Sequence, residues 1–408
     1  MPNRRSLVTL CLWSLLGSST ALADGLDPES RFSLGGFGTL GLAHNSTAGA
    51  EFIRDILQPR GVAHGWSGDV DSRLGLQASF RPTAELEGTV QAVSLYNDAG
   101  NYKPELVWAF VGYSPDPEVK ARVGRLGFDA YMLSDSRNVG YSYLWVRPPV
   151  EYFGPLQITH IDGADATFKR DLGGWLASAK LYAGRAQQKI PGANGVEFDL
   201  SGSGVAGANV DFRKGDWYLR LGYTQIHFAN EYAALAPLLS ALRGIGTAQS
   251  AALASDLAFD GKTARSTSAG GAWEHGPWQA QLVYNRTTSD ALAIAPTDSA
   301  YFLLGRRIEA WTGFVTLAGA RSPLSQRTTG LPTPNPLDDA LRTPLVGGRS
   351  NQRSLSIGAR YDFARDFDLK VQVDHVRASD DARFTWRNPR ADWNGRATVL
   401  SIALDFVF

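Results

Sequence analysis

Along much of this chain, segments of about ten to thirteen residues alternate apolar and polar side chains. In residues 367–373, the odd positions are Phe, Leu, Val and Val, whereas Asp, Lys and Gln occupy the even positions. Residues 400–408 repeat the pattern, with Leu, Ile, Leu, Phe and Phe on one face. A period of two is typical of a β-strand that has one apolar and one polar face. A half-buried sheet of a water-soluble protein shows the same period. The connections between the strands must therefore distinguish a membrane barrel from a soluble sheet.

The alternation predicts about sixteen antiparallel strands, an even number. The predicted strands lie near 30–43, 69–81, 84–96, 103–114, 118–126, 161–171, 174–186, 202–213, 216–229, 264–275, 277–290, 298–307, 311–321, 352–363, 366–379 and 396–408. A hairpin hidden in 44–68 or 322–351 would raise the count to eighteen. Residues 232–257, rich in Ala and Leu, indicate one or two short helices inside a long loop.

The predicted connections alternate between short turns and longer segments. The short turns are 81–83, 114–117, 170–173, 214–215, 275–277, 307–310 and 364–365. A transmembrane barrel with short periplasmic turns and long extracellular loops is built in this way, whereas a β-sandwich has no reason to be.

Aromatic residues recur at the level of the short turns. Five of them open successive strands just after a turn: Trp175, Trp217, Trp278, Trp311 and Phe367. Six more lie near the ends of the preceding strands: Phe80, Tyr113, Phe168, Phe212, Trp273 and Phe363. Together they predict an aromatic girdle at one membrane interface.

These patterns predict an all-β fold, a transmembrane antiparallel β-barrel. Unpaired backbone groups in hydrocarbon cost several kcal/mol each, so the sheet must close and the first and last strands must pair. No apolar run beyond residue 23 is long enough for a transmembrane helix.

The first 23 residues resemble a cleaved secretory signal. Arg4 and Arg5 precede the apolar stretch 7–16, and Ala21-Leu-Ala23 follows it. We therefore expect a signal peptide at 1–23 and a single barrel domain at 24–408. Cys11 is the only cysteine and lies in the signal, so the mature chain would hold no disulfide or cysteine-bound metal.

The charge balance and the motifs do not favour other classes of function. The chain has 40 basic and 40 acidic residues, so nothing indicates nucleic-acid binding. The histidines are scattered, and no serine lies in a Gly-x-Ser-x-Gly motif, which argues against a metal site and against an enzyme. We expect no cofactor.

The chain resembles the general-diffusion porins of Gram-negative outer membranes, and the resemblance covers essentially the whole mature chain. The resemblance rests on the terminal Phe408, the ending Leu-Asp-Phe-Val-Phe at 404–408, the strand Gly-Ala-Arg-Tyr-Asp at 358–362, and Asp-Leu-Lys-Val-Gln at 368–372. It implies a sixteen-stranded homotrimer in the outer membrane whose third extracellular loop folds into the pore. It also implies that Phe408 is the signal for the barrel insertion machinery.

The link at 127–160 is the candidate third loop. It departs from the family's compact acidic loop, because its nearest phrase is Pro-Val-Glu-Tyr-Phe-Gly at 149–154. It is also crowded with aromatic residues: Phe128, Tyr131, Tyr141, Tyr143, Trp145, Tyr152 and Phe153. These rings could stack on a flat or sugar-like solute, or they could pack the loop's own small core.

The alternation also predicts which charged residues face the lumen. The candidate lining and constriction residues are Arg73, Lys120, Arg122, Asp135, Arg137, Arg147, Glu151, Lys169, Arg220, Arg360 and Lys370. Acidic partners on the same side would be Asp71, Glu87, Asp165, Asp374 and Asp405. Fixed charges of both signs set the ion preference of a channel, although a solvated barrel wall would carry the same residues.

We therefore expect an outer-membrane porin for passive diffusion of small polar solutes and ions. The alternatives are a substrate-selective channel for aromatic or sugar-like solutes and a surface-binding or adhesion barrel. A sixteen-stranded barrel leaves a water-filled channel, whereas one of eight to ten strands is filled by side chains, which favours transport.

Overall fold

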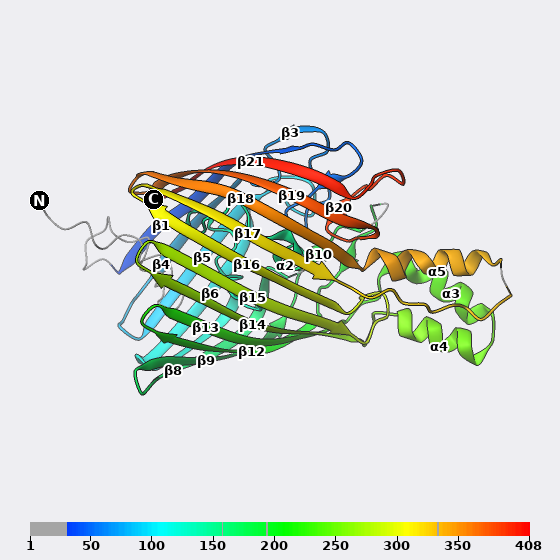
Figure 1. Cartoon of the computed structure of the whole chain (residues 1–408). Coiled ribbons are helices and arrows are strands. Elements are labelled where there is room, and N and C mark those ends of the chain that lie inside the picture. Colours follow the sequence, from blue (N-terminus) through cyan, green and yellow to red (C-terminus); the bar gives the residue numbers. More distant parts are fainter. Residues whose placement is uncertain (1–30, 157, 193–194, 333) are drawn as a thin grey trace, which may run out of the picture.

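The alternating segments form one closed barrel in the computed structural model (Figure 1). The structure describes residues 31–408 except 157, 193–194 and 333. The predicted signal peptide, with Cys11, lies outside the described residues. Among the described residues, no helix is both long and apolar enough to cross a membrane.

Sixteen strands make the barrel, and each coincides with a predicted segment. They are β1 (Phe32–Asn45), β4 (Arg73–Phe80), β5 (Leu86–Leu95), β6 (Glu105–Asp116), β7 (Val119–Gly127), β8 (His160–Leu172), β9 (Trp175–Arg185), β12 (Gly204–Lys214), β13 (Trp217–His227), β14 (Thr263–His275), β15 (Trp278–Ser289), β16 (Thr297–Ile308), β17 (Trp311–Arg321), β18 (Ser350–Ala364), β19 (Phe367–Arg383) and β21 (Arg396–Val407). Short β3 (Gly65–Ser67) adds to the same sheet beside β1. The predicted sixteen-stranded barrel is confirmed.

The first and last strands close the barrel, as expected. In β1, Thr39 lies opposite Asp405 of β21 on one side and opposite Arg73 of β4 on the other. Beyond the end of β21, the Phe408 amide donates to the Gly36 carbonyl, and the Gly36 amide donates to the Phe408 carbonyl. No edge is therefore left unpaired at the seam.

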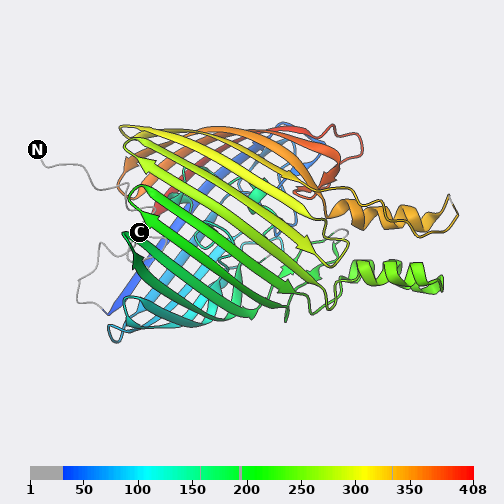
Figure 2. The same ribbon diagram turned by 60° about the horizontal axis from the view of Figure 1, so that its bottom comes forward.

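Short turns and long connections occupy opposite ends of the barrel, which we call the turn end and the loop end (Figure 2). The long connections contain the remaining short elements: β2 (Glu51–Phe52), η1 (Gly140–Ser142), α2 (Val150–Phe153), β10 (Lys189–Ile190), β11 (Phe198–Asp199), η3 (Ala233–Leu235), α3 (Ala236–Gly244), α4 (Ala248–Leu257), α5 (Pro336–Gly347) and β20 (Trp386–Arg387). Segment 44–68 adds only β2 and β3, and 322–351 forms α5. The eighteen-strand alternative is therefore wrong.

Three helices stand out from the loop end as a small bundle (Figure 2). The Thr247 side chain caps α4, and the Asn335 side chain caps α5, each by accepting a backbone N–H of the first turn. Leu242 of α3, Leu257 of α4 and Leu341 of α5 are fully buried. Apolar packing between two separate loops therefore holds the helices together. The predicted helices within 232–257 are confirmed.

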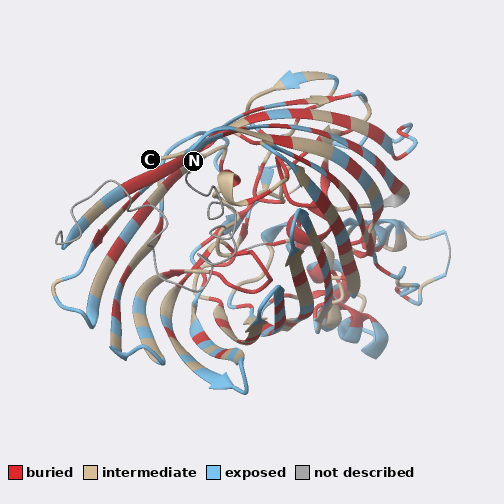
Figure 3. Ribbon diagram, turned by 60° about the vertical axis from the view of Figure 1, so that its left-hand side comes forward, coloured by how far each residue is buried: buried red, intermediate tan, exposed pale blue. Residues whose placement is uncertain are grey.

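The outer face of the barrel is apolar. Burial alternates residue by residue along the strands (Figure 3). Large apolar side chains such as Leu40, Val123 and Leu282 are more than half exposed. A continuous exposed surface of this kind suits hydrocarbon and is very rare on a water-soluble monomer.

The predicted aromatic girdle lies at the turn end. Trp175, Trp217, Trp278, Trp311 and Phe367 are the first residues of β9, β13, β15, β17 and β19. The rings of Trp217, Trp311 and Phe367 meet aromatic neighbours on adjacent strands, and Trp311 stacks on Tyr361 with ring centroids 4.4 Å apart. Rings at this level match the headgroup region of a bilayer.

Candidate pore and its third loop

The link between β7 and β8 turns into the barrel, as the family resemblance implied. Along its length it contacts the inner faces of β9, β13, β16, β17, β18, β19, β21 and β4. We call residues 128–159 the third loop. Four sets of contacts hold the loop in place: charged and amide side chains make three of them, and aromatic side chains make the fourth.

The first set surrounds Arg147, which is 1 % exposed. Its guanidinium lies 2.6 Å from an Asp71 carboxylate oxygen and 3.0 Å from one of Asp374, and it also donates to the Ser401 hydroxyl. The guanidinium carbon sits 4.9 Å above the Phe52 ring. Burial of the charges of Arg147, Asp71 and Asp374 away from water is unfavourable. Each charge is stabilised only by the opposite charge beside it.

In the second set, three cations of the barrel wall bind the loop backbone. Arg73 donates to the carbonyl of Asn138, Lys370 to that of Gly140 and Arg360 to that of Tyr141, at 2.6, 2.7 and 2.6 Å. Lys370 also lies 2.8 Å from an Asp405 carboxylate oxygen.

The loop comes so close to the wall here that Gly140 has no room for a side chain. A Cβ added at this position would collide with the Asp405 carboxylate and the Thr39 hydroxyl. The backbone of this part of the loop therefore rests directly on β1 and β21.

The third set lies on β9, β12 and β13. The Asp129 carboxylate is 2.6 Å from Arg220 and 3.0 Å from Lys180, and Asn209 donates to the Asp129 carbonyl at 2.7 Å. Burial alone would raise the pKa of Asp129, but Arg220 and Lys180 hold it below its ordinary value. Asp129 is therefore charged and fixed.

The fourth set is aromatic. The Trp145 indole N–H donates to the Thr316 hydroxyl at 2.9 Å, and its ring meets Tyr301 edge-on at 5.7 Å. Tyr152 packs on Tyr131, Phe153 and Tyr301. Of the two uses considered for these rings, the structure shows packing within the loop's own core.

Glu151 lies beside this aromatic core and is completely buried. One of its carboxylate oxygens accepts a hydrogen bond from the Gln352 amide at 2.7 Å. Burial raises the pKa of the Glu151 carboxyl above its ordinary value.

The third loop leaves one part of the inner wall partly exposed. On β7, Lys120 pairs with Glu87 at 2.6 Å and Arg122 pairs with Asp165. The Lys120 and Arg122 side chains keep 24 % and 20 % exposure, whereas that of Lys370 has none. Lys169 of β8 lies within electrostatic reach of Lys120. We call strands β7 and β8 the exposed wall.

Opposite this wall the loop presents the half-buried residues 135–139. Asp135 lies within electrostatic reach of Arg122, and burial raises the pKa of its carboxyl to about 6, helped by the nearby Asp129. The Arg137 carbonyl accepts a hydrogen bond from Arg54 at 2.6 Å.

The predicted lining residues therefore fall into two groups. Six are buried in contacts between the third loop and the wall: Arg73, Arg147, Glu151, Arg220, Arg360 and Lys370. Five keep some exposure inside the barrel: Lys120, Arg122, Asp135, Arg137 and Lys169. For all eleven residues, contact with a passing solute stays a prediction.

Two cations at this site were not among the predicted residues. Lys180 shares its strand face with Ser178 and Tyr182, so the alternation alone could have identified it. Arg54 lies in the first long connection, where no periodic pattern exists. Within the described part of the chain, no group of three or more His, Cys, Asp or Glu side chains could hold a metal ion.

A closed barrel with an apolar outer face and an inward loop among fixed charges defines a transmembrane channel. A family model described as "Gram-negative porin" matches residues 8–381, and the chain belongs to this family. It is an outer-membrane channel, and the substrate-selective and adhesion alternatives are not favoured.

Solved structures of three porin-like proteins share the fold. An anion-selective porin from Comamonas acidovorans is 14 % identical, covering 92 % of this chain and 99 % of its own, with a TM-score of 0.55. Salmonella typhi OmpF, in a complex with daunomycin, is 11 % identical over 92 % and 97 %, with a TM-score of 0.55. The trimer form of Vibrio cholerae OmpT is 13 % identical over 93 % and 100 %, with a TM-score of 0.52. No curated protein sequence matches the chain.

Proposed function

We propose that ions and small polar solutes diffuse passively between the exposed wall and residues 135–139 of the third loop. The observation that carries this proposal is the unequal burial of the interior charges. Lys370 and Arg147 are buried between the loop and the barrel wall, whereas Lys120 and Arg122 keep about a fifth of their side-chain surface exposed. Hydrated side chains are the ones that a solute in water can meet. The channel is passive and has no catalytic step.

The two sides of this passage carry different charges. The wall contributes Lys120, Arg122 and Lys169, and the loop contributes Asp135 together with Arg137. Glu87 and Asp165 compensate part of the basic charge. A basic wall that faces the carboxylate of Asp135 creates a local transverse field, which orients dipolar solutes and disfavours apolar ones.

We also propose that the protein is a homotrimer. The support is its membership of the porin family and its fold likeness to the trimer form of Vibrio cholerae OmpT. Sedimentation of the detergent-extracted protein tests this, and a monomeric mass would contradict it.

The channel itself is tested by reconstitution into a planar lipid bilayer. We expect discrete conductance steps in KCl and a reversal potential that changes in the double variant Lys120→Gln and Arg122→Gln. The matched control is Arg286→Gln, because Arg286 pairs with Asp298 at the exposed loop end of β15. Absence of any conductance would refute the channel. An unchanged reversal potential in the double variant would refute the proposed route.

A further inference from the structure

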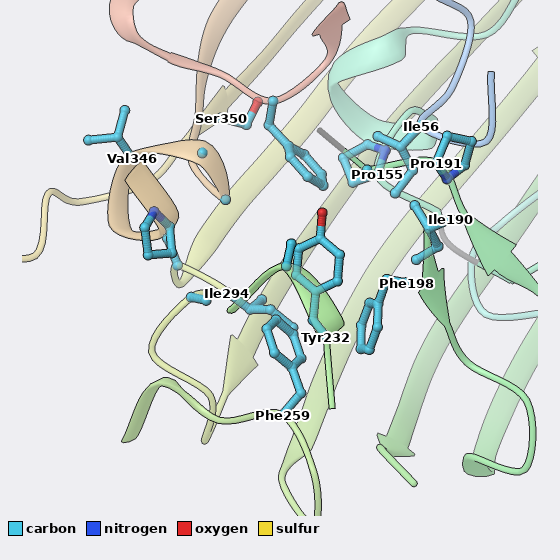
Figure 4. Close-up of a pocket in the computed structure, with 18 of the residues that line it drawn as sticks. Ile56, Pro155, Ile190, Pro191, Phe198, Tyr232, Phe259, Ile294, Val346 and Ser350 are labelled. Atoms are coloured by element: carbon cyan, nitrogen blue, oxygen red, sulfur yellow. The ribbon is translucent and has the colours of Figure 1, made fainter. Parts of the chain in front are cut away.

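A large cavity lies at the loop end, outside the part of the third loop that is bound to the barrel wall. Its volume is about 1760 Å³. The inner faces of α3 and α5, the β10–β11 hairpin and the segment around β20 line it, and the third loop contributes Phe128, Tyr131 and Tyr152 (Figure 4). Seven connections at the loop end besides the third loop therefore contribute to this chamber.

The chamber is lined mainly by apolar and aromatic side chains. Figure 4 shows Phe198, Tyr232 and Phe259 together on one side and Ile56, Pro155 and Pro191 on another. Phe198 and Phe259 meet with ring centroids 4.7 Å apart. A lining of this kind binds solutes that have apolar surface. Diffusion of small polar solutes alone does not require it.

Two hydroxyl groups on the lining have no hydrogen-bond partner among the described residues. They are Tyr152 Oη and Ser350 Oγ, and both side chains are at most 2 % exposed. A buried polar atom without a partner is unfavourable by about 1–3 kcal/mol. Both oxygen atoms are shielded from solvent, so a polar atom in the chamber would pair with them only after a small movement of the lining.

Arginines outnumber carboxylates on the lining. Its charged residues are Arg60, Arg265, Arg383, Arg387 and Arg390 against Asp98 and Glu197. Arg387 of β20 donates to the carbonyl oxygens of Gln58 and Ile56 at 2.9 and 2.5 Å, and the carboxylates of Asp55 and Glu51 lie within its electrostatic reach. The excess of positive charge means that the chamber favours an anion over a cation.

We propose that this chamber binds amphipathic aromatic carboxylates before they enter the pore. The aromatic body would lie against Phe198 and Phe259, and the carboxylate would face Arg387. A sugar would leave most of its hydroxyls unpaired against this lining, and an organic cation would meet Arg387. The inference rests on the proposed channel, because the chamber lies at the extracellular mouth of the barrel.

The probe is 1-naphthoate, and its binding is measured by fluorescence titration of the intact protein in detergent. The same probe is added to the extracellular side in a bilayer, where we expect it to reduce the KCl current reversibly. Arg387→Gln should weaken binding on the order of tenfold, because a charge-assisted contact is lost. The control Arg396→Gln changes an exposed arginine outside the lining and should bind as the wild type does.

A second pair of variants tests the location without changing charge. Ala241→Trp on α3 would place an indole into the chamber, whereas Ala251→Trp on α4 adds the same group outside the lining. We expect the first variant to lose 1-naphthoate binding and the second to keep it. Wild-type-like binding by Arg387→Gln or by Ala241→Trp would overturn the inference. Normal KCl conductance without 1-naphthoate binding would overturn the proposed binding chamber but not the proposed channel. Absence of conductance would overturn the proposed channel.

Discussion

Arg147 shows how strongly a single side chain can fix a loop. Its guanidinium compensates two buried carboxylates that belong to opposite ends of the sequence, Asp71 and Asp374. Replacing all members of a buried ion pair or triad by apolar residues can leave the stability of a protein unchanged. Removal of one partner alone destabilises the protein, because it leaves an unpaired buried charge. Substitution of Arg147 alone should therefore destabilise the loop more than apolar replacement of Arg147, Asp71 and Asp374 together.

We predict that Arg147→Met destabilises the docked third loop by about 3–5 kcal/mol, because Asp71 and Asp374 lose their cation. The measurement is urea unfolding of the folded protein together with the noise of the open-channel current. The control is Arg265→Met, which breaks an exposed pair with Asp290 and should leave both readouts unchanged. A stable, quiet channel in Arg147→Met would contradict the anchoring role.

Asp135 gives the passage a pH dependence. Burial raises the pKa of its carboxyl to about 6, so its negative charge is present above that pH and is lost below it. We expect anion preference to increase when the pH falls from about 7.5 to about 5, with a midpoint near pH 6. The reversal potential in a KCl gradient measures this change, and Asp135→Asn should abolish the step.

The sign of the stability effect follows from the same pKa. Because the pKa of Asp135 in the folded protein lies above its ordinary value, ionisation opposes docking of the loop as the pH rises through about 6. Asp135→Asn should therefore stabilise the loop at neutral pH and have little effect at low pH. Destabilisation at neutral pH would contradict this reasoning.

At the scale of elements, the third loop covers part of the inner wall of the barrel. Its segment 141–152 carries Trp145, Arg147 and Glu151, and it covers the inner faces of β17, β18 and β19. Without this segment, water would hydrate Asp71 and Asp374, so the two carboxylates would no longer need Arg147 to compensate their charge.

We therefore predict that deletion within 141–152 leaves a folded barrel with larger conductance steps. Planar-bilayer recording is the measurement, and far-ultraviolet circular dichroism confirms that the β-structure remains. Unchanged conductance would show that the third loop does not constrict the pore.

The elements differ in how well the sequence predicts them. β17 was predicted with the same bounds, 311–321, because alternation is a local property that each strand carries in its own residues. The helices α3 and α4 also follow from local composition. The extra residues 380–383 of β19 and the short strands β2, β3 and β20 have no such pattern and were missed.

The site was predicted less completely than the strands. Alternation correctly directed Lys370 and Arg360 inward, but it could not reveal that the third loop covers them. That outcome depends on contacts between residues more than 200 positions apart. The chamber at the loop end was missed for the same reason, since its lining comes from several separate connections.

At the scale of the whole molecule, the two ends of the barrel differ in shape and chemistry. The turn end is short and ringed by aromatic residues, and the loop end carries the bundle of α3, α4 and α5 (Figure 1). A porin is oriented with its long loops towards the outside of the cell.

This orientation can be tested by labelling single cysteines in intact cells. Cys11 lies in the predicted signal peptide, so the mature chain should have no thiol background. We predict that a membrane-impermeant maleimide labels Ala248→Cys, at the exposed start of α4, and not Glu118→Cys, in the exposed turn before β7. Glu118→Cys should react once the outer membrane is permeabilised. The reverse labelling pattern would contradict the orientation.

The contacts of Arg147 also constrain the order in which the protein can assemble. Its partners Asp71, Asp374 and Ser401 are separated from it by 76, 227 and 254 residues. Asp374 and Ser401 belong to the last strands that leave the ribosome, so docking of the loop cannot be completed while the chain is still being synthesised. A chain truncated before β19 would keep the contacts of Asp129 with Lys180 and Arg220 but lose those of Arg147 with Asp374 and Ser401, and we expect its third loop to be more sensitive to protease.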